Sequence, residues 1–214
     1  MRASGRRGRR WWLWGAIVLI IALILVLVGI IALPILMHRD GGLSHQQSSD
    51  GTWAGTATAR GDDGRTRSIT VRGESGGAVD PGALAVGDRI VVEGSGFDAS
   101  QGIYVAVCVV PASPAEKPGP CVGGAPQEAQ DAEAHHGEVQ WAASNWINDD
   151  WAWRLFGSRS YDDAADGTFT AYLELADPGE IDCSAEQCAI VTRNDHTAAA
   201  DRVQDVYLPI RLVG

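Results

Sequence analysis

An uncharged run of 27 residues, Trp11 to Met37, constrains this 214-residue chain more than any other feature. A helix rises about 1.5 Å per residue, so the run would span about 40 Å and exceed the ~30 Å hydrocarbon core of a bilayer. Five arginines lie in the first ten positions, and only Arg39 follows the run closely. The positive-inside rule therefore predicts a cytoplasmic basic tail over 1–10, a transmembrane helix over 11–37 and an extracytoplasmic remainder.

A cleaved signal peptide is the alternative explanation of this run. The apolar region of a signal peptide usually has about 7–15 residues and ends in a small-residue cleavage site. Here the run is longer and ends in Pro34, Ile35, Leu36 and Met37. The sequence therefore favours an uncleaved anchor in the cell membrane.

The charge of the remainder limits its partners. The chain has 17 basic and 27 acidic residues; six of the basic ones and one acidic one precede residue 41, which leaves 11 against 26. Such an acidic body repels the phosphates of nucleic acids and anionic lipid headgroups. We expect no binding to nucleic acid.

Residues 38–80 are predicted to be an extracytoplasmic stalk or linker. Segment 41–51 is rich in Gly and Ser and has the composition of a flexible linker. Segments 52–60 and 65–72 flank Gly-Asp-Asp-Gly and could pair as a hairpin. Only Trp53, Ile69 and Val71 would give this hairpin a buried face, so a disordered stalk is the alternative.

From about residue 81 short apolar stretches alternate with glycine and proline. Predicted strands cover 89–93, 102–110, 167–175, 189–192 and 205–213, with another around Trp141 within 139–148. Alternating, β-branched stretches of this length are typical of half-buried strands. Pro209 falls on the outward face of the last strand, as in an edge strand. The sequence predicts an all-β domain, a β-sandwich, over 81–214.

Four cysteines lie in this predicted domain: Cys108, Cys121, Cys183 and Cys188. Outside the cell membrane disulfides persist, and four cysteines allow three pairings. We predict Cys108–Cys121 and Cys183–Cys188, which close two short loops. A four-cysteine metal site is the alternative, but these spacings lack the C-x₂-C pattern that structural zinc prefers.

Several motifs occur in an order that resembles the neocarzinostatin family. They are GSGF at 94–97, the strand ending in Cys108, DGTF at 166–169 and IDCSAEQC at 181–188. Related modules of bacterial cell-surface proteins, some of them beside haem-uptake domains, typically carry KPGPC and a TRxDHT…DRxQDV…LP tail. These segments stand here at 117–121, 192–197, 201–206 and 208–209. The resemblance covers about residues 81–214.

The resemblance implies a seven-stranded immunoglobulin-like β-sandwich with two disulfide-closed ribbons. In secreted antibiotic carriers of the family, the cleft between sandwich and ribbons holds an enediyne chromophore. This chain departs from those carriers because it has the apolar run and a long, Trp-rich segment over 127–163. The resemblance therefore supports the fold more than the cargo.

The loop around His196 is the first candidate binding site. Arg193, Asp195 and His196 lie close to Asp201, Arg202 and Asp205. A histidine held by a carboxylate can act as a general base. The alternative is a structural network of ion pairs between two strands, with at least one bidentate Arg–carboxylate pair. No Ser or Cys nucleophile occurs in a recognisable motif, so we expect no enzyme and no catalytic residue.

The second candidate is the tryptophan-rich segment. Its members are Trp141, Trp146, Trp151 and Trp153, near Phe156 and Tyr161. Aromatic side chains form apolar recognition surfaces, but they could also cover the open face of a small sandwich. His135 and His136, with Glu133 and Glu138, could bind a metal, although a solvated loop is the default and no metal or cofactor is expected.

The sequence thus predicts a membrane-anchored, extracytoplasmic, non-enzymatic module that binds an unknown small ligand or acts as a scaffold with an envelope partner. The alternative function is accessory binding or uptake of haem or another apolar small molecule, which only the family resemblance suggests.

Overall fold

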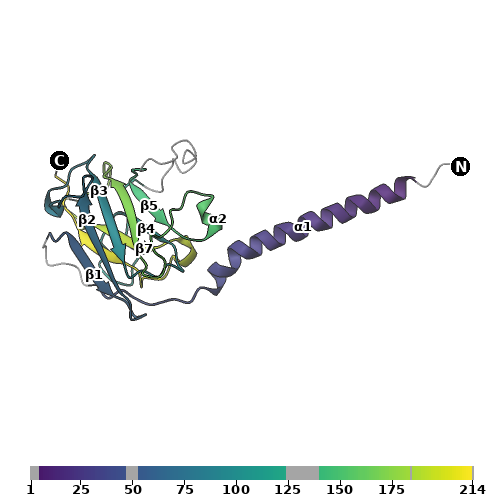
Figure 1. The fold of residues 1–214 in the computed structure, drawn as a ribbon, viewed down its shortest axis with the longest axis horizontal. Coiled ribbons are helices and arrows are strands. Elements are labelled where there is room, and N and C mark those ends of the chain that lie inside the picture. The colour runs from purple at the N-terminus through teal and green to yellow at the C-terminus, as the bar shows by residue number, and fades with distance from the viewer. Residues whose placement is uncertain (1–4, 47–52, 124–139, 184, 214) are drawn as a thin grey trace. The chain divides into compact units, whose positions relative to one another are not determined.

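The computed structural model describes residues 5–46, 53–123, 140–183 and 185–213. The chain divides into two compact units, Met1–Arg39 and Asp40–Gly214. The first contains helix α1 (Gly5–Met37; Figure 1), in which the stretch Trp11–Ile30 has a mean hydropathy of 3.1 and is not buried. By length and composition, this stretch can cross a membrane.

The second unit is an antiparallel β structure (Figure 1). Its eight strands, counted over the described residues, are β1 (Thr56–Arg60), β2 (Thr66–Gly73), β3 (Arg89–Ser95), β4 (Ile103–Val109), β5 (Ser144–Ile147), β6 (Phe169–Glu174), β7 (Cys188–Asn194) and β8 (Val206–Pro209). One sheet has the order β1-β2-β3-β6 and the other β5-β4-β7-β8. The described part of this unit also contains three short helical turns: η1 (Pro81–Ala83), α2 (Trp151–Arg154) and η2 (His196–Ala198). The predicted all-β sandwich is confirmed in outline, with eight strands rather than seven.

The core lies between the two sheets and follows from the alternation along the strands. In β4, Ile103, Val105 and Val107 are buried in it, together with residues of β2, β3 and β6 from the other sheet. The intervening residues Tyr104 and Ala106 point to the outer face of β4, because successive side chains of a strand point to opposite sides. This outer face carries the candidate site described below.

The predicted hairpin is present, but the predicted boundary at residue 81 is corrected. Strands β1 and β2 pair in register, and β2 also pairs with β3, so the hairpin forms half of one sheet. Ile69 and Val71 enter the core, and Arg67 is fully buried as well, bonded to Asp63 and Gln204. A prediction from apolar residues alone could not include this buried arginine. The compact unit begins at Asp40 and not at residue 81.

Residues 41–46 are also ordered, contrary to the expectation of a flexible linker. The backbone N–H of Gly41 donates to Asp201, and Leu43 forms a bridge with Arg202. The side-chain amide of Gln46 bonds both the carbonyl and the N–H of Tyr207. These contacts lie beside β8, an edge strand that would otherwise expose its backbone groups.

Both predicted disulfides are formed. Cys108 pairs with Cys121 and Cys183 with Cys188, across sequence separations of 13 and 5 residues. The four-cysteine metal site is therefore excluded. The first bridge ties the proline-rich loop after β4 to the outer face of its sheet, where Cys108 and Ala106 lie in a small apolar cluster with Val191 and Tyr207.

Candidate binding surface

Strand register places Tyr104, Trp146 and Arg193 in one row. On the outer face of its sheet, Tyr104 of β4 stands opposite Trp146 of β5 on one side and opposite Arg193 of β7 on the other. The guanidinium carbon of Arg193 lies 5.6 Å from the centroid of the Tyr104 ring, and the Trp146 centroid lies 5.9 Å from it. Tyr104 therefore links an aromatic and a cationic part of the same face.

The segment after β5 adds further rings to this row. Asp150 caps the short helix α2 by accepting a hydrogen bond from the backbone of Ala152, which fixes its first turn. Trp153 on α2 lies 5.7 Å from Trp146 and 6.1 Å from Phe156, measured between ring centroids. Helix α2 has no buried residue, so it adds nothing to the buried core. It contacts the sheet through the ring of Trp153, which lies against Trp146 of β5.

His196 is the last ring of this group of neighbouring aromatic side chains. Its ring centroid lies 4.8 Å from Trp153 and 5.2 Å from Trp146, in edge-to-face geometry, and its Nδ1 is 2.8 Å from the hydroxyl of Tyr104. His196 and Phe156 are exposed, whereas the other rings are half-buried. We call the five residues Tyr104, Trp146, Trp153, Phe156 and His196 the aromatic surface.

A buried carboxylate holds this surface from beneath. Asp195 has no exposed area, and one of its oxygens accepts hydrogen bonds of 2.8 Å from Trp146 Nε1 and from Asn148 Nδ2. The other oxygen accepts from the backbone and hydroxyl of Thr197, which caps η2. These bonds join β5 to the turn that carries His196. The aromatic surface is therefore preorganised and not a loose cover.

Gly102 shows how tightly this junction is packed. A Cβ atom at this position would collide with the carboxylate of Asp195 and with the amide of Asn148. The backbone N–H of Asp195 donates to the carbonyl of Gly102 at 2.8 Å. Only glycine permits this close approach of backbone and side chains.

The structure brings together most of the predicted site residues but separates two of them. Trp146, Trp153, Arg193, Asp195 and His196 meet at the aromatic surface or directly beneath it. Trp141 lies elsewhere, edge-on to Tyr172 of β6 and under Arg89 of β3. Trp151 is 63% exposed at the start of α2 and makes no ring contact among the described residues.

Two members of the site were not predicted from the sequence. Tyr104 was counted only as part of an apolar strand, although its place between Ile103 and Val105 gives it the outward face. Asn148 was not singled out in the sequence, and it is buried against Asp195. His135, His136 and the nearby glutamates lie outside the described residues.

The predicted pairing of His196 with a carboxylate is not the one observed. The carboxylate of Asp195 is occupied by Trp146, Asn148 and Thr197, and the imidazole bonds the hydroxyl of Tyr104 instead. Burial raises the pKa of Tyr104, so its hydroxyl stays protonated and can donate to Nδ1. The geometry fixes the ring orientation of His196.

The predicted Arg–carboxylate pair in this loop is present. Arg202 Nη1 donates to Asp205 Oδ2 at 3.2 Å, and both side chains are buried. The pair is not bidentate, because the remaining guanidinium nitrogens donate to the carbonyls of Ala199 and Ala200. Burial raises the pKa of Asp205 to about 7, although Arg202 and the hydroxyl of Tyr207 act in the opposite direction.

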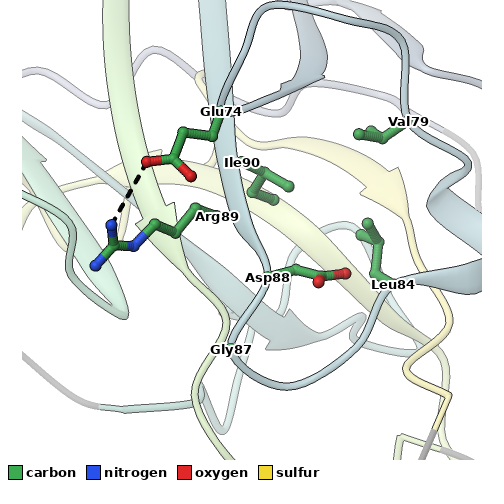
Figure 2. A pocket seen from close by; sticks show the side chains of 7 residues that line it. All are labelled: Glu74, Val79, Leu84, Gly87, Asp88, Arg89 and Ile90. Carbon is green, nitrogen blue, oxygen red and sulfur yellow. Dashed lines mark hydrogen bonds and ion pairs between the residues drawn. The ribbon is translucent and has the colours of Figure 1, made fainter.

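An open hollow of about 500 Å³ lies at the start of β3 (Figure 2). Its lining residues are Glu74, Val79, Leu84, Gly87, Asp88, Arg89 and Ile90. Arg89 pairs with Glu74 and with Glu174, and Asp88 accepts a hydrogen bond from the backbone of Ala85. Its charged groups are thus paired with one another or with backbone. None of the predicted binding residues lines it, although Trp141 contacts Arg89.

No family model and no solved structure matches the chain, so the resemblance to the neocarzinostatin family stays a prediction. The chain is similar to thiamine biosynthesis protein X of Corynebacterium glutamicum, with 26% identity over 129 residues. The match covers 60% of this chain and 58% of that protein, so the chain spans little more than half of the relative.

Proposed function

We propose that this protein is a non-enzymatic binding module that helix α1 anchors in the cell membrane, with its β unit on the extracytoplasmic side. Two formed disulfides support an oxidising location, and the five arginines before the apolar run support this orientation. An immunoglobulin-like, neocarzinostatin-like ancestry of the sandwich is part of the same proposal and rests on the motif order.

The aromatic surface is the proposed binding site. The observation that carries this proposal is its construction: exposed and half-buried rings contact one another over a carboxylate with four hydrogen bonds. Rings that merely covered a core would need no such support. Flat aromatic side chains fixed in advance bind apolar or aromatic groups with little loss of conformational entropy. We therefore expect a small ligand with a flat apolar group.

A fluorescence titration of the unit Asp40–Gly214 tests this function. The unit contains the whole described core and both disulfides, so we expect it to fold without α1. Quenching of its tryptophans would be measured with haem, glycans and apolar dyes. Thiamine belongs in the panel because of the relative's name.

Matched variants decide where a ligand binds. Trp153→Ala removes a ring of the aromatic surface, and Trp141→Ala removes a half-buried ring that packs on Tyr172 instead. We expect the first variant to lose about tenfold or more in affinity and the second to stay within twofold of wild type. If no compound binds, or if both variants lose affinity equally, the surface is not a ligand site and a scaffolding role with an envelope partner is favoured.

A further inference from the structure

Arg193 is a half-buried cation on the outer face of β7. Among the described residues its guanidinium makes no hydrogen bond or ion pair, and it lies over the ring of Tyr104. Other arginines of the unit, such as Arg72 and Arg202, pair with carboxylates. Burial, and then the charge of Arg202, lower the pKa of Arg193. A polar group that is partly withdrawn from water without a partner is costly to the folded state.

Lys117 adds a second cation to this region. It is exposed on the proline-rich loop that the Cys108–Cys121 bridge closes. The charge of Arg193 is the main cause of its lowered pKa, and Arg202 contributes as well. The bridge attaches this loop to the outer face of β4, where Cys108 and Tyr104 both point outward and Tyr104 stands opposite Arg193. Both cations therefore belong to one face of a unit that is strongly acidic as a whole. The repulsion between them falls when an anion binds.

The cationic group adjoins the aromatic surface through Tyr104. Arg193 lies over the Tyr104 ring, while the hydroxyl of the same ring bonds His196 and its other neighbour is Trp146. A ligand that contacts the aromatic rings can thus place a charged end beside Arg193. Asp205 is the carboxylate whose charge acts on Arg193, and its Oδ2 already accepts from Arg202 and Tyr207.

We infer that Arg193 and Lys117 bind the anionic group, a carboxylate or phosphate, of a ligand whose apolar rings lie on the aromatic surface. The inference rests on the proposed function and specifies its ligand class as an amphipathic aromatic anion. Arg193 supplies a planar donor group and Lys117 a mobile point charge, a combination suited to either kind of oxyanion.

A pair of dyes separates the two parts of this ligand. 1-Anilinonaphthalene-8-sulfonate and N-phenyl-1-naphthylamine share one ring system and differ in the sulfonate, which stands in for the natural anion. Both would be titrated into Asp40–Gly214 and into the variants Arg193→Gln and Lys117→Gln. Arg60→Gln, at an exposed arginine of β1, is the matched control. Lys117 is exposed, so its variant will fold even if Arg193→Gln does not.

We expect the sulfonate dye to bind wild type more tightly than the neutral dye. Arg193→Gln should weaken the sulfonate dye about tenfold and Lys117→Gln about threefold, with the neutral dye and the control within twofold. Added salt should weaken only the sulfonate dye. Unchanged sulfonate binding in these variants, or equal losses for both dyes, overturns the anionic subsite and leaves the aromatic surface intact. Binding of neither dye to wild type refutes the proposed function and this inference with it.

Discussion

Removing the carboxylate of Asp195 should loosen the aromatic surface and destabilise the β unit. In Asp195→Ala, the buried amide of Asn148 and the indole N–H of Trp146 lose their acceptor, and η2 loses its cap. A buried unsatisfied donor costs about 1–3 kcal/mol and a lost cap about 1 kcal/mol. Trp146 is half-buried, so its donor counts at the low end of this range, and the three losses add to about 3–5 kcal/mol. This is a large part of the usual 5–15 kcal/mol of domain stability.

Urea denaturation of Asp40–Gly214, followed by tryptophan fluorescence, measures this loss. Asp177→Ala is the control, since that exposed carboxylate accepts a turn bond from Gly179, and it should cost about 0.5 kcal/mol or less. A loss below about 1 kcal/mol in Asp195→Ala would refute the view that this carboxylate supports the rings.

Three further predictions concern the packing, titration and cross-links of the unit. Gly102→Ala should cost about 1–3 kcal/mol in the same denaturation, because its Cβ would collide with Asp195; a neutral effect would contradict the packing. The pKa of Asp205 is about 7 in the folded unit and about 3.9 unfolded, so the folded form binds its proton more tightly. The unfolding free energy should therefore fall from pH 4 to 7 in wild type relative to Asp205→Asn, and parallel pH profiles would disprove the raised pKa. Replacing Cys108 and Cys121 together by Ala should lower the stability by about 3 kcal/mol, more than loss of the bridge with the shorter loop. Calorimetry of both double variants measures the two losses, and equal losses would contradict the dependence on loop length.

The sequence predicted those features that depend on local patterns. The alternation in 167–175 placed Phe169, Ala171 and Leu173 inward, and all three are buried. The short cysteine spacings predicted both bridges. The apolar run predicted α1, because length and hydropathy alone define such a helix.

Features that depend on long-range partners were missed. By its few apolar residues, the hairpin was too polar to be predicted as part of the core. The burial of Arg67 depends on its bond to Gln204, which is 137 residues away, and no local pattern reveals such a partner. Density of tryptophan could not separate Trp141 from Trp146, since their neighbours come from different sheets. Nor could the loop sequence reveal that Asp195 supports Trp146 and not His196, because that choice is made by strand register.

The most direct test of the proposed binding surface is a two-dimensional NMR titration of the indole N–H signals. Asp40–Gly214 contains five tryptophans, and the Trp146 signal is marked by its bond to Asp195. With 1-anilinonaphthalene-8-sulfonate added to saturation, the signals of Trp146 and Trp153 should shift, and that of Trp141 should stay unchanged. Shifts confined to Trp141, beside the hollow at Arg89, would contradict the account and place the ligand on the other sheet.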